Sequence, residues 1–121
     1  MKVEECYAKF GGDYASVKER LPDDALVQRF LNKFLADTSY ERLSNAVKEG
    51  DYVEAFRAAH TLKGVSQNLS LQRLSNSVST LTELLRNKTN EQVDKDSCAV
   101  LFEEVSLDYA AVVEAVRQLQ D

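Results

Sequence analysis

The chain has 121 residues, of which 44% are hydrophobic and 29% are charged. This size suits one compact domain that buries its own core, while a formal net charge of −5 argues against a nucleic-acid binder, because contacts to phosphates need a basic face. Four glycines and one proline leave little material for the turns of an all-β chain. We therefore expect an all-helical fold, with residues 1–121 forming a single domain.

Location and metal binding are constrained by what the sequence omits. The first residues contain no apolar run of signal-peptide length, and nowhere do about eighteen apolar residues follow one another. We expect a cytoplasmic protein with no membrane partner. Cys6 and Cys98 lie far apart and form no CxxC pair, so we predict no metal site and interpret both as reduced thiols that act as small apolar residues.

Two short helices are expected near the N-terminus. Apolar clusters at residues 3–10 and 14–21 are separated by Gly11 and Gly12, and Asp13 is placed to cap the second helix. We expect these helices to lie across one end of a helical bundle.

A longer helical pattern follows Pro22. Apolar residues at three- and four-residue spacing cover residues 23–49, but the apolar stripe shifts beyond Ala36. This shift fits one bent helix or two abutting helices, and we favour one. Gly50 is placed to end the segment in a left-handed conformation, and Asp51 is placed to cap the next helix.

The helix expected over residues 51–68 carries His60, the one histidine of the chain. The residues that we expect to face the core follow steps of three and four, and they are Tyr52, Ala55, Phe56, Ala59, Leu62, Ser66 and Leu69. At 100° per residue, His60 points about 110° away from the centre of this stripe. Its imidazole should therefore lie at the core boundary or in solvent.

Two further helices complete the pattern. Ser70 is expected to cap a helix that ends near Leu85, and we interpret its hydroxyl-rich stretch, residues 75–82, as a solvated face. Residues 88–96 indicate a polar loop, after which apolar spacing returns up to the C-terminus. Four such helices bury their stripes most simply as an antiparallel up-down four-helix bundle, with its core over about residues 23–120 and one or two short N-terminal helices.

The neighbours of His60 on its helix suit phosphoryl chemistry. Arg57, Lys63, Gly64 and Gln67 stand three residues before it and three, four and seven residues after it. A helical glycine costs about 1 kcal/mol relative to alanine, so Gly64 needs a reason, and clearing an approach to the imidazole supplies one. Arg57 and Lys63 would place two cations beside a phosphoryl group. Because imidazole titrates near neutral pH, one ring nitrogen is free to attack phosphorus.

Structural interpretations of the same residues remain open at this point. Gly64 could permit close packing of helices, the stem of Lys63 could cover apolar surface, and Gln67 could simply be solvated. A bundle that holds a metal or cofactor is disfavoured, because inward carboxylates and histidines at ExxH spacing do not occur.

The run from His60 to Gly64, His-Thr-Leu-Lys-Gly, resembles the signature of histidine-containing phosphotransfer (HPt) domains. The likeness continues outside this run and covers nearly the whole chain from about Gly12. It includes Gly50-Asp51-Tyr52, Ala58-Ala59, Asn68-Leu69 and the segment from Leu71 to Leu74.

This resemblance implies a four-helix bundle whose histidine accepts a phosphoryl group from the aspartate of one receiver domain and passes it to another. His60 would be the phosphoacceptor, Lys63 would lie near the phosphorylated ring, and Gly64 would keep the approach open. In some members a glutamine on the neighbouring helix hydrogen-bonds the imidazole. Thr82 occupies the matching position here, which leaves open whether Thr82 or Gln67 contacts the ring.

The resemblance also implies how the work is divided between the two proteins. The receiver supplies the aspartate, the divalent metal and most of the transition-state stabilisation, so this chain would bind no cofactor and would not be an enzyme on its own. Val53, Arg57, Gly64 and Gln67 around His60 would form the docking face. We expect a monomer whose partners are receiver domains of response regulators or of hybrid histidine kinases.

Two alternatives to a free-standing carrier remain. The chain could be the histidine domain of a larger kinase of the chemotaxis type, or a helical adaptor in which His60 is never modified. Because no glycine-rich nucleotide loop occurs, we expect the phosphoryl group to come from a protein and not from ATP. Met1 and a complete bundle favour the free-standing carrier.

Overall fold

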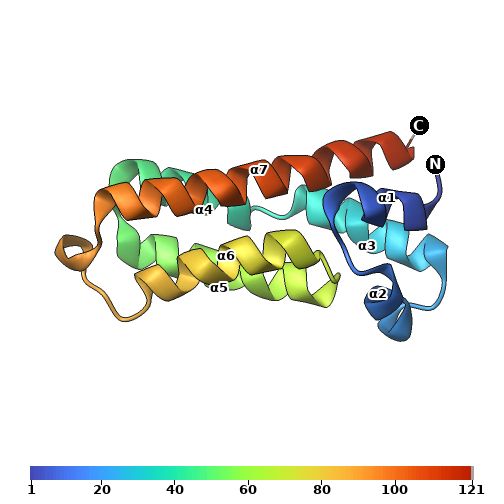
Figure 1. Ribbon diagram of the computed structural model, residues 1–121, viewed down its shortest axis with the longest axis horizontal. Coiled ribbons are helices and arrows are strands. Elements are labelled where there is room, and N and C mark those ends of the chain that lie inside the picture. The colour runs from blue at the N-terminus through green and yellow to red at the C-terminus, as the bar shows by residue number, and fades with distance from the viewer. Residues whose placement is uncertain (121) are drawn as a thin grey trace.

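The computed structural model describes residues 1–120, and most of them are helical (Figure 1). The elements are α1 (Val3–Phe10), α2 (Tyr14–Arg20), α3 (Asp24–Ala36), α4 (Ser39–Glu49), α5 (Tyr52–Asn68), α6 (Gln72–Leu85), the 3-10 turn η1 (Asn90–Gln92) and α7 (Lys95–Gln120). The part of the chain that is described contains no strand, so the predicted all-helical class is confirmed.

The long helices lie side by side along the longest axis of the molecule. Figure 1 shows α3 and α4 leading away from the end that holds both termini, α5 returning, α6 leading away again and α7 running back along the whole length. α5 packs against α4 and α6, and α6 also packs against α7. Their apolar stripes meet in one buried cluster, which places α5 between two neighbours with one side free.

Helix termini form where the sequence supplies caps. Gly50 ends α4 in the left-handed conformation with a φ of 70°, as predicted. The carboxylate of Asp51 accepts the backbone N–H of Glu54 at 3.2 Å and so caps α5. Asp13 caps α2 in the same way, accepting the backbone N–H of Ser16 at 3.0 Å. The stop at Gly50 and the cap at Asp51 together fix where the helix with His60 begins.

The prediction of one bent helix over residues 23–49 is wrong, because α3 and α4 are separate helices. Asp37 is extended, with φ −69° and ψ 135°, so the chain leaves the helical path there. Its carboxylate accepts the backbone N–H of Ser39 at 2.9 Å and also the hydroxyl of that serine. α4 therefore begins with its own side-chain bonds, which offset the loss of helical bonds at the break.

Ser70 does not cap α6 as predicted. Its φ is 53°, so it forms a left-handed corner, and α6 begins at Gln72 with Leu71 at the N-cap position. The hydroxyl of Ser70 accepts a hydrogen bond from Arg20 at 2.6 Å and donates to the Ser16 hydroxyl at 2.9 Å. The side chain thus joins the corner to α2 instead of capping the helix that follows.

Two other polar stretches are less solvated than expected. Within residues 75–82, Ser75 and Thr82 are buried, so the solvated face is confined to part of this stretch. The predicted loop over residues 88–96 contains η1 and a buried Val93, and α7 already begins inside it. The loop is thereby attached to the end of the bundle by an apolar side chain.

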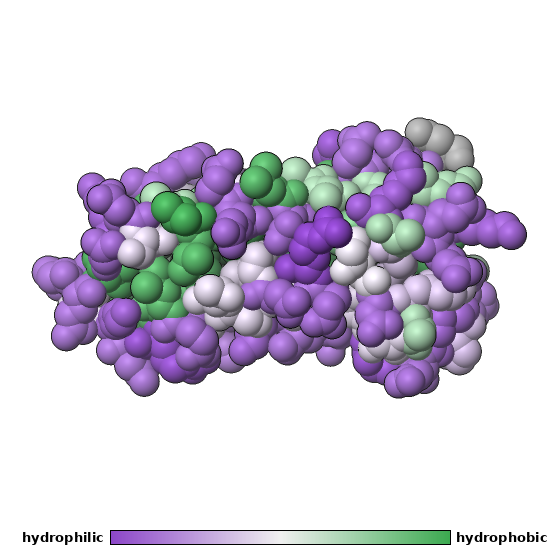
Figure 2. All heavy atoms as spheres, in the orientation of Figure 1, coloured by the Kyte–Doolittle hydropathy of each residue, from purple (hydrophilic) through white to green (hydrophobic). Residues whose placement is uncertain are grey.

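The side of the molecule seen in Figure 2 is mostly hydrophilic, with apolar residues gathered where α6 ends and α7 begins. On α7, Val100 and Leu107 are 62% and 63% exposed. Among residues 1–120, no helix combines the length and the apolar character that crossing a bilayer requires.

The N-terminal helices fasten the corner between α5 and α6. Figure 1 shows α1 and α2 at the end of the molecule that holds both termini, as expected. The buried hydroxyl of Tyr7 donates to the carbonyl oxygen of Leu69 at 2.8 Å, and the backbone N–H of Asp13 donates to the carbonyl of Ser70 at 2.9 Å. Burial raises the pKa of Tyr7, so its hydroxyl remains a donor at neutral pH.

We predict that Tyr7→Phe lowers the free energy of unfolding by about 1–3 kcal/mol, because the carbonyl of Leu69 loses its buried donor. Urea denaturation measures the change. Tyr14→Phe serves as the control, because the Tyr14 hydroxyl bonds Asp24 in a partly exposed place where water can substitute. Equal unfolding midpoints for Tyr7→Phe and the unmodified chain would show that this hydrogen bond does not contribute to stability.

Candidate functional site

His60 lies on the exposed side of α5, near the middle of the helix. The side chains of Ala55, Ala59, Leu62 and Ser66 are fully buried on the opposite side. The exposed side carries the predicted docking residues at three- and four-residue steps, and these are Val53, Arg57, Gly64 and Gln67. The structure therefore brings all five predicted residues onto one surface and confirms that His60 reaches solvent.

Gly64 faces open space one turn beyond His60. A Cβ built at this position would meet no atom of a neighbouring element within 4 Å. Close packing of helices therefore does not explain the glycine, and that alternative is wrong. Because this position carries no side chain, it leaves room near the imidazole for a second molecule.

Arg57 lies on the side of His60 that faces α4. Its Nη1 stands 3.5 Å from a carboxylate oxygen of Glu54, whose other oxygen bonds Arg42 of α4 at 3.2 Å. Exposed ion pairs of this kind contribute about 0–1 kcal/mol, so the guanidinium can exchange partners at little cost. Arg57 thus lies on the same surface as His60, as the sequence predicts, and the carboxylate of Glu54 lies beside it.

Lys63 lies on the other side of His60, towards α6, and is half-buried. The hydrogen bond from Arg86 holds the pKa of the Glu83 carboxyl below its ordinary value, with smaller contributions from the charges of Arg86 and Lys63. Lys63 is thus within electrostatic reach of Glu83 on α6. The two predicted cations flank the imidazole on opposite sides.

Neither candidate partner forms a hydrogen bond with the imidazole. Thr82 is fully buried, and its hydroxyl donates to the carbonyl of Val78 at 2.7 Å within its own helix. Gln67 is exposed, and its side chain makes no hydrogen bond to His60. Within residues 1–120, no protein group hydrogen-bonds a ring nitrogen of His60, so both nitrogens face solvent or a docking partner.

The sequence did not reveal the contact of Phe56 with His60 or the contact of Arg86 with Phe56. Phe56, assigned to the inward stripe, is half-buried, and its ring centroid lies 6.0 Å from that of the imidazole with the planes 22° apart. The guanidinium of Arg86 lies 5.3 Å from the centroid of the Phe56 ring. The four-residue spacing of Phe56 from His60 was an available signal. No such spacing signal pointed to Arg86, because it follows the last turn of α6 and does not lie on the helix that carries His60.

Two hollows border α5, and one of them adjoins the surface around His60. This smaller hollow, of about 240 Å³, is lined by Val53, Phe56, Arg57, Leu85, Asn87 and Lys88. It includes two of the predicted docking residues.

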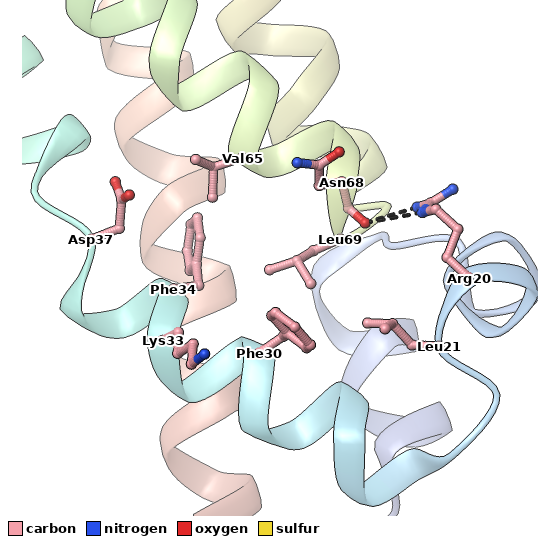
Figure 3. A pocket seen from close by; sticks show the side chains of 9 residues that line it. All are labelled: Arg20, Leu21, Phe30, Lys33, Phe34, Asp37, Val65, Asn68 and Leu69. Carbon is pink, nitrogen blue, oxygen red and sulfur yellow. Dashed lines mark hydrogen bonds between the residues drawn. The ribbon is translucent and has the colours of Figure 1, made fainter.

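The second hollow, of about 350 Å³, lies between α3 and the C-terminal part of α5, where Phe30, Phe34, Val65 and Leu69 converge (Figure 3). It is not lined by His60 or by any residue predicted to surround the phosphoryl group.

Comparison with known families identifies the chain. The family model of the Hpt domain matches residues 25–121, so the chain belongs to the Hpt domain family and that prediction is confirmed. No curated protein and no solved structure shows a significant match. The family is one of phosphocarriers that take part in histidine phosphotransfer and interact with receiver domains in phosphorelays.

We predict that Gly64→Ala raises the free energy of unfolding by about 1 kcal/mol, because alanine is the better helix former and the added methyl group meets no neighbour. Gly50→Ala is the matched control and should be destabilising by a similar amount, since Gly50 requires a positive φ. Both changes are measured by urea denaturation. A loss of stability in Gly64→Ala would contradict the open surroundings of Gly64.

Proposed function

We propose that this chain is a phosphocarrier of a two-component phosphorelay that carries a phosphoryl group on His60 between aspartates of receiver domains. The observation that carries the proposal is the open space at Gly64, one helical turn from an exposed imidazole. A glycine that weakens its helix without improving internal packing is explained by a partner that must come close. Family membership supports the same chemistry.

The bundle serves as a rigid support in this proposal. Residues 1–121 would form one domain. Its antiparallel bundle would have four parts, namely α3 together with α4, then α5, α6 and α7, and α5 would present the reactive side chain. The buried side of α5 holds the helix in place, so docking need not order the backbone. A fixed nucleophile lowers the entropy lost on reaching the transition state.

The transfer step needs little from the carrier itself. The ring nitrogen of His60 that bears no proton attacks the phosphorus of an aspartyl phosphate. As the N–P bond forms, the P–O bond to the aspartate breaks and the aspartate leaves as a carboxylate. Arg57 and Lys63, three residues before and after His60, would pair with phosphoryl oxygens. The reverse reaction returns the group to a second receiver.

The remaining parts of the reaction are assigned to the partner. The receiver would supply the aspartate and the divalent metal, so the carrier binds no cofactor. Its docking face would be Val53, Arg57, Gly64 and Gln67 around His60, with the hollow next to Val53 as part of the contact. The carrier would act as a cytoplasmic monomer towards receivers of response regulators or hybrid histidine kinases.

We predict that incubation with a phosphorylated receiver labels the chain with one acid-labile, alkali-stable phosphate, and that His60→Gln abolishes this label. Phosphate on histidine nitrogen has this stability, whereas phosphate on serine or threonine resists acid. Far-UV circular dichroism should show the same helical content for both proteins, since the His60 side chain is exposed. Label that persists in His60→Gln would refute the assignment, and an unmodified chain would favour an adaptor.

We also predict that Gly64→Leu slows phosphoryl transfer by about tenfold or more while helical content stays nearly intact, because the side chain blocks the approach without disturbing the core. Rapid-quench kinetics with a phosphorylated receiver measures the rate. Gly64→Ala, which adds only a methyl group, should slow transfer less. A Gly64→Leu variant with an unchanged rate would remove the steric argument for this glycine.

A further inference from the structure

The imidazole of His60 is exposed, and none of the described residues hydrogen-bonds its ring nitrogens. A nucleophile in this situation samples several rotamers, and most of them aim the reactive nitrogen away from a docked partner. Something other than a hydrogen bond must therefore orient the ring if the carrier is to react efficiently. The aromatic contact to Phe56 is the candidate that the structure offers.

Phe56 and His60 are one helical turn apart on α5, and Phe56 is the one that is turned towards α6, since it lines a hollow together with Leu85. Their planes differ by 22° and their centroids are 6.0 Å apart, which is the offset, nearly parallel arrangement that aromatic pairs favour. Phe56 is half-buried and packs against the apolar core. It is consequently more fixed than the exposed ring beside it.

Arg86 restrains Phe56 from the other helix. Its guanidinium carbon lies 5.3 Å from the centroid of the Phe56 ring. The same guanidinium pairs with Glu83, to which Nε donates at 3.2 Å and Nη2 donates at 3.0 Å. A planar group that lies over a ring and is also bonded in a forked manner is restrained by two contacts together, which a lysine could not reproduce.

We propose, on the basis of the function proposed above, that Phe56 is a positioning residue that orients the imidazole of His60 for phosphoryl transfer, and that Arg86, held by Glu83, keeps Phe56 in place. Phe56 acts through His60 and does not touch the phosphoryl group. The contact therefore governs the rate of transfer within the docked complex more than the affinity of docking. It takes the part that a hydrogen bond from the position of Thr82 would otherwise play.

The first test uses the free protein and its single histidine, whose imidazole proton signals are assigned without ambiguity by NMR spectroscopy. The ring current of Phe56 should displace these signals, and Phe56→Leu should return them to the positions of an unstacked imidazole. Phe102→Leu is the matched control, because Phe102 is also half-buried but packs beside Tyr40 on α4, at 5.9 Å between centroids. That variant should leave the His60 signals unchanged.

Variants of Arg86 test the second half of the proposal. Arg86→Gln and Arg86→Lys should both weaken the displacement of the His60 signals, since each loses the planar guanidinium that lies over Phe56 and is forked onto Glu83. If Arg86→Lys retained the full displacement, a positive charge alone would suffice and the role assigned to the planar group would be overturned.

The second test separates turnover from docking by using saturation kinetics with a phosphorylated receiver. Phe56→Leu should lower kcat for transfer about fivefold, as expected for losing one aromatic pair, with KM changed by less than about twofold. Phe56→Tyr keeps the ring and should restore the rate. Loss of the fold would instead lower kcat in both Phe56→Leu and Phe102→Leu. Circular dichroism identifies that case, because helical content would fall as well.

The outcomes distinguish this inference from the function on which it rests. Unchanged NMR signals and an unchanged kcat in Phe56→Leu would overturn the positioning role while the unmodified chain still accepts phosphate. A rise in KM with constant kcat would make Phe56 a docking residue and would also overturn it. If the unmodified chain accepts no phosphate from any receiver, the proposed function itself fails, whatever the NMR spectra show.

Discussion

The rotation of α5 about its own axis is the constraint on which the site depends. Small and apolar side chains on one side, including Ala55, Ala59 and Leu62, are fully buried between α4 and α6, and this packing fixes which side faces outwards. A turn of one residue, about 100°, would bury a polar side chain in place of an apolar one at a cost of roughly 1–3 kcal/mol. The exposure of His60 is thus a consequence of core packing.

Electrostatics around His60 differ from those of the whole chain. The protein carries a net charge of −5, yet Arg57 and Lys63 stand three residues before and after His60 on α5, and Arg86, just after α6, lies over the neighbouring Phe56 ring. Each has a carboxylate nearby, Glu54 for Arg57 and Glu83 for the other two. These acids limit repulsion among the cations when no phosphate is present. In the function proposed above, this local group of cations would favour a doubly charged phosphoryl group on an otherwise acidic molecule.

Periodicity predicted the parts of the structure that depend on local sequence. The position of His60, the cap at Asp51 and the stop at Gly50 all follow from helical spacing and from backbone preferences. The break at Asp37 was missed because an apolar stripe does not show that a side chain can replace helical hydrogen bonds. The left-handed corner at Ser70 was missed because its hydroxyl bonds α2, which is distant in sequence.

The immediate surroundings of His60 were harder to predict than His60 itself. Phe56 stands at the edge between the buried and exposed sides of α5, where a period of 3.6 residues cannot separate a core ring from a half-exposed one. Arg86 is 26 positions away from His60, and only the antiparallel pairing of α5 with α6 brings it near. The buried state of Thr82 likewise depends on that pairing.

The N-terminal helices have a consequence for how the domain is delimited. The family match begins at residue 25, whereas Tyr7 and Arg20, which precede it, donate to backbone oxygens at the corner that follows α5. A shortened protein cut at the family boundary would leave those oxygens without donors and would expose apolar surface of α7 that α1 now covers. If members of this family were compared as shortened proteins, an effect of the loosened end of α5 would then be mistaken for a difference in the chemistry of the histidine.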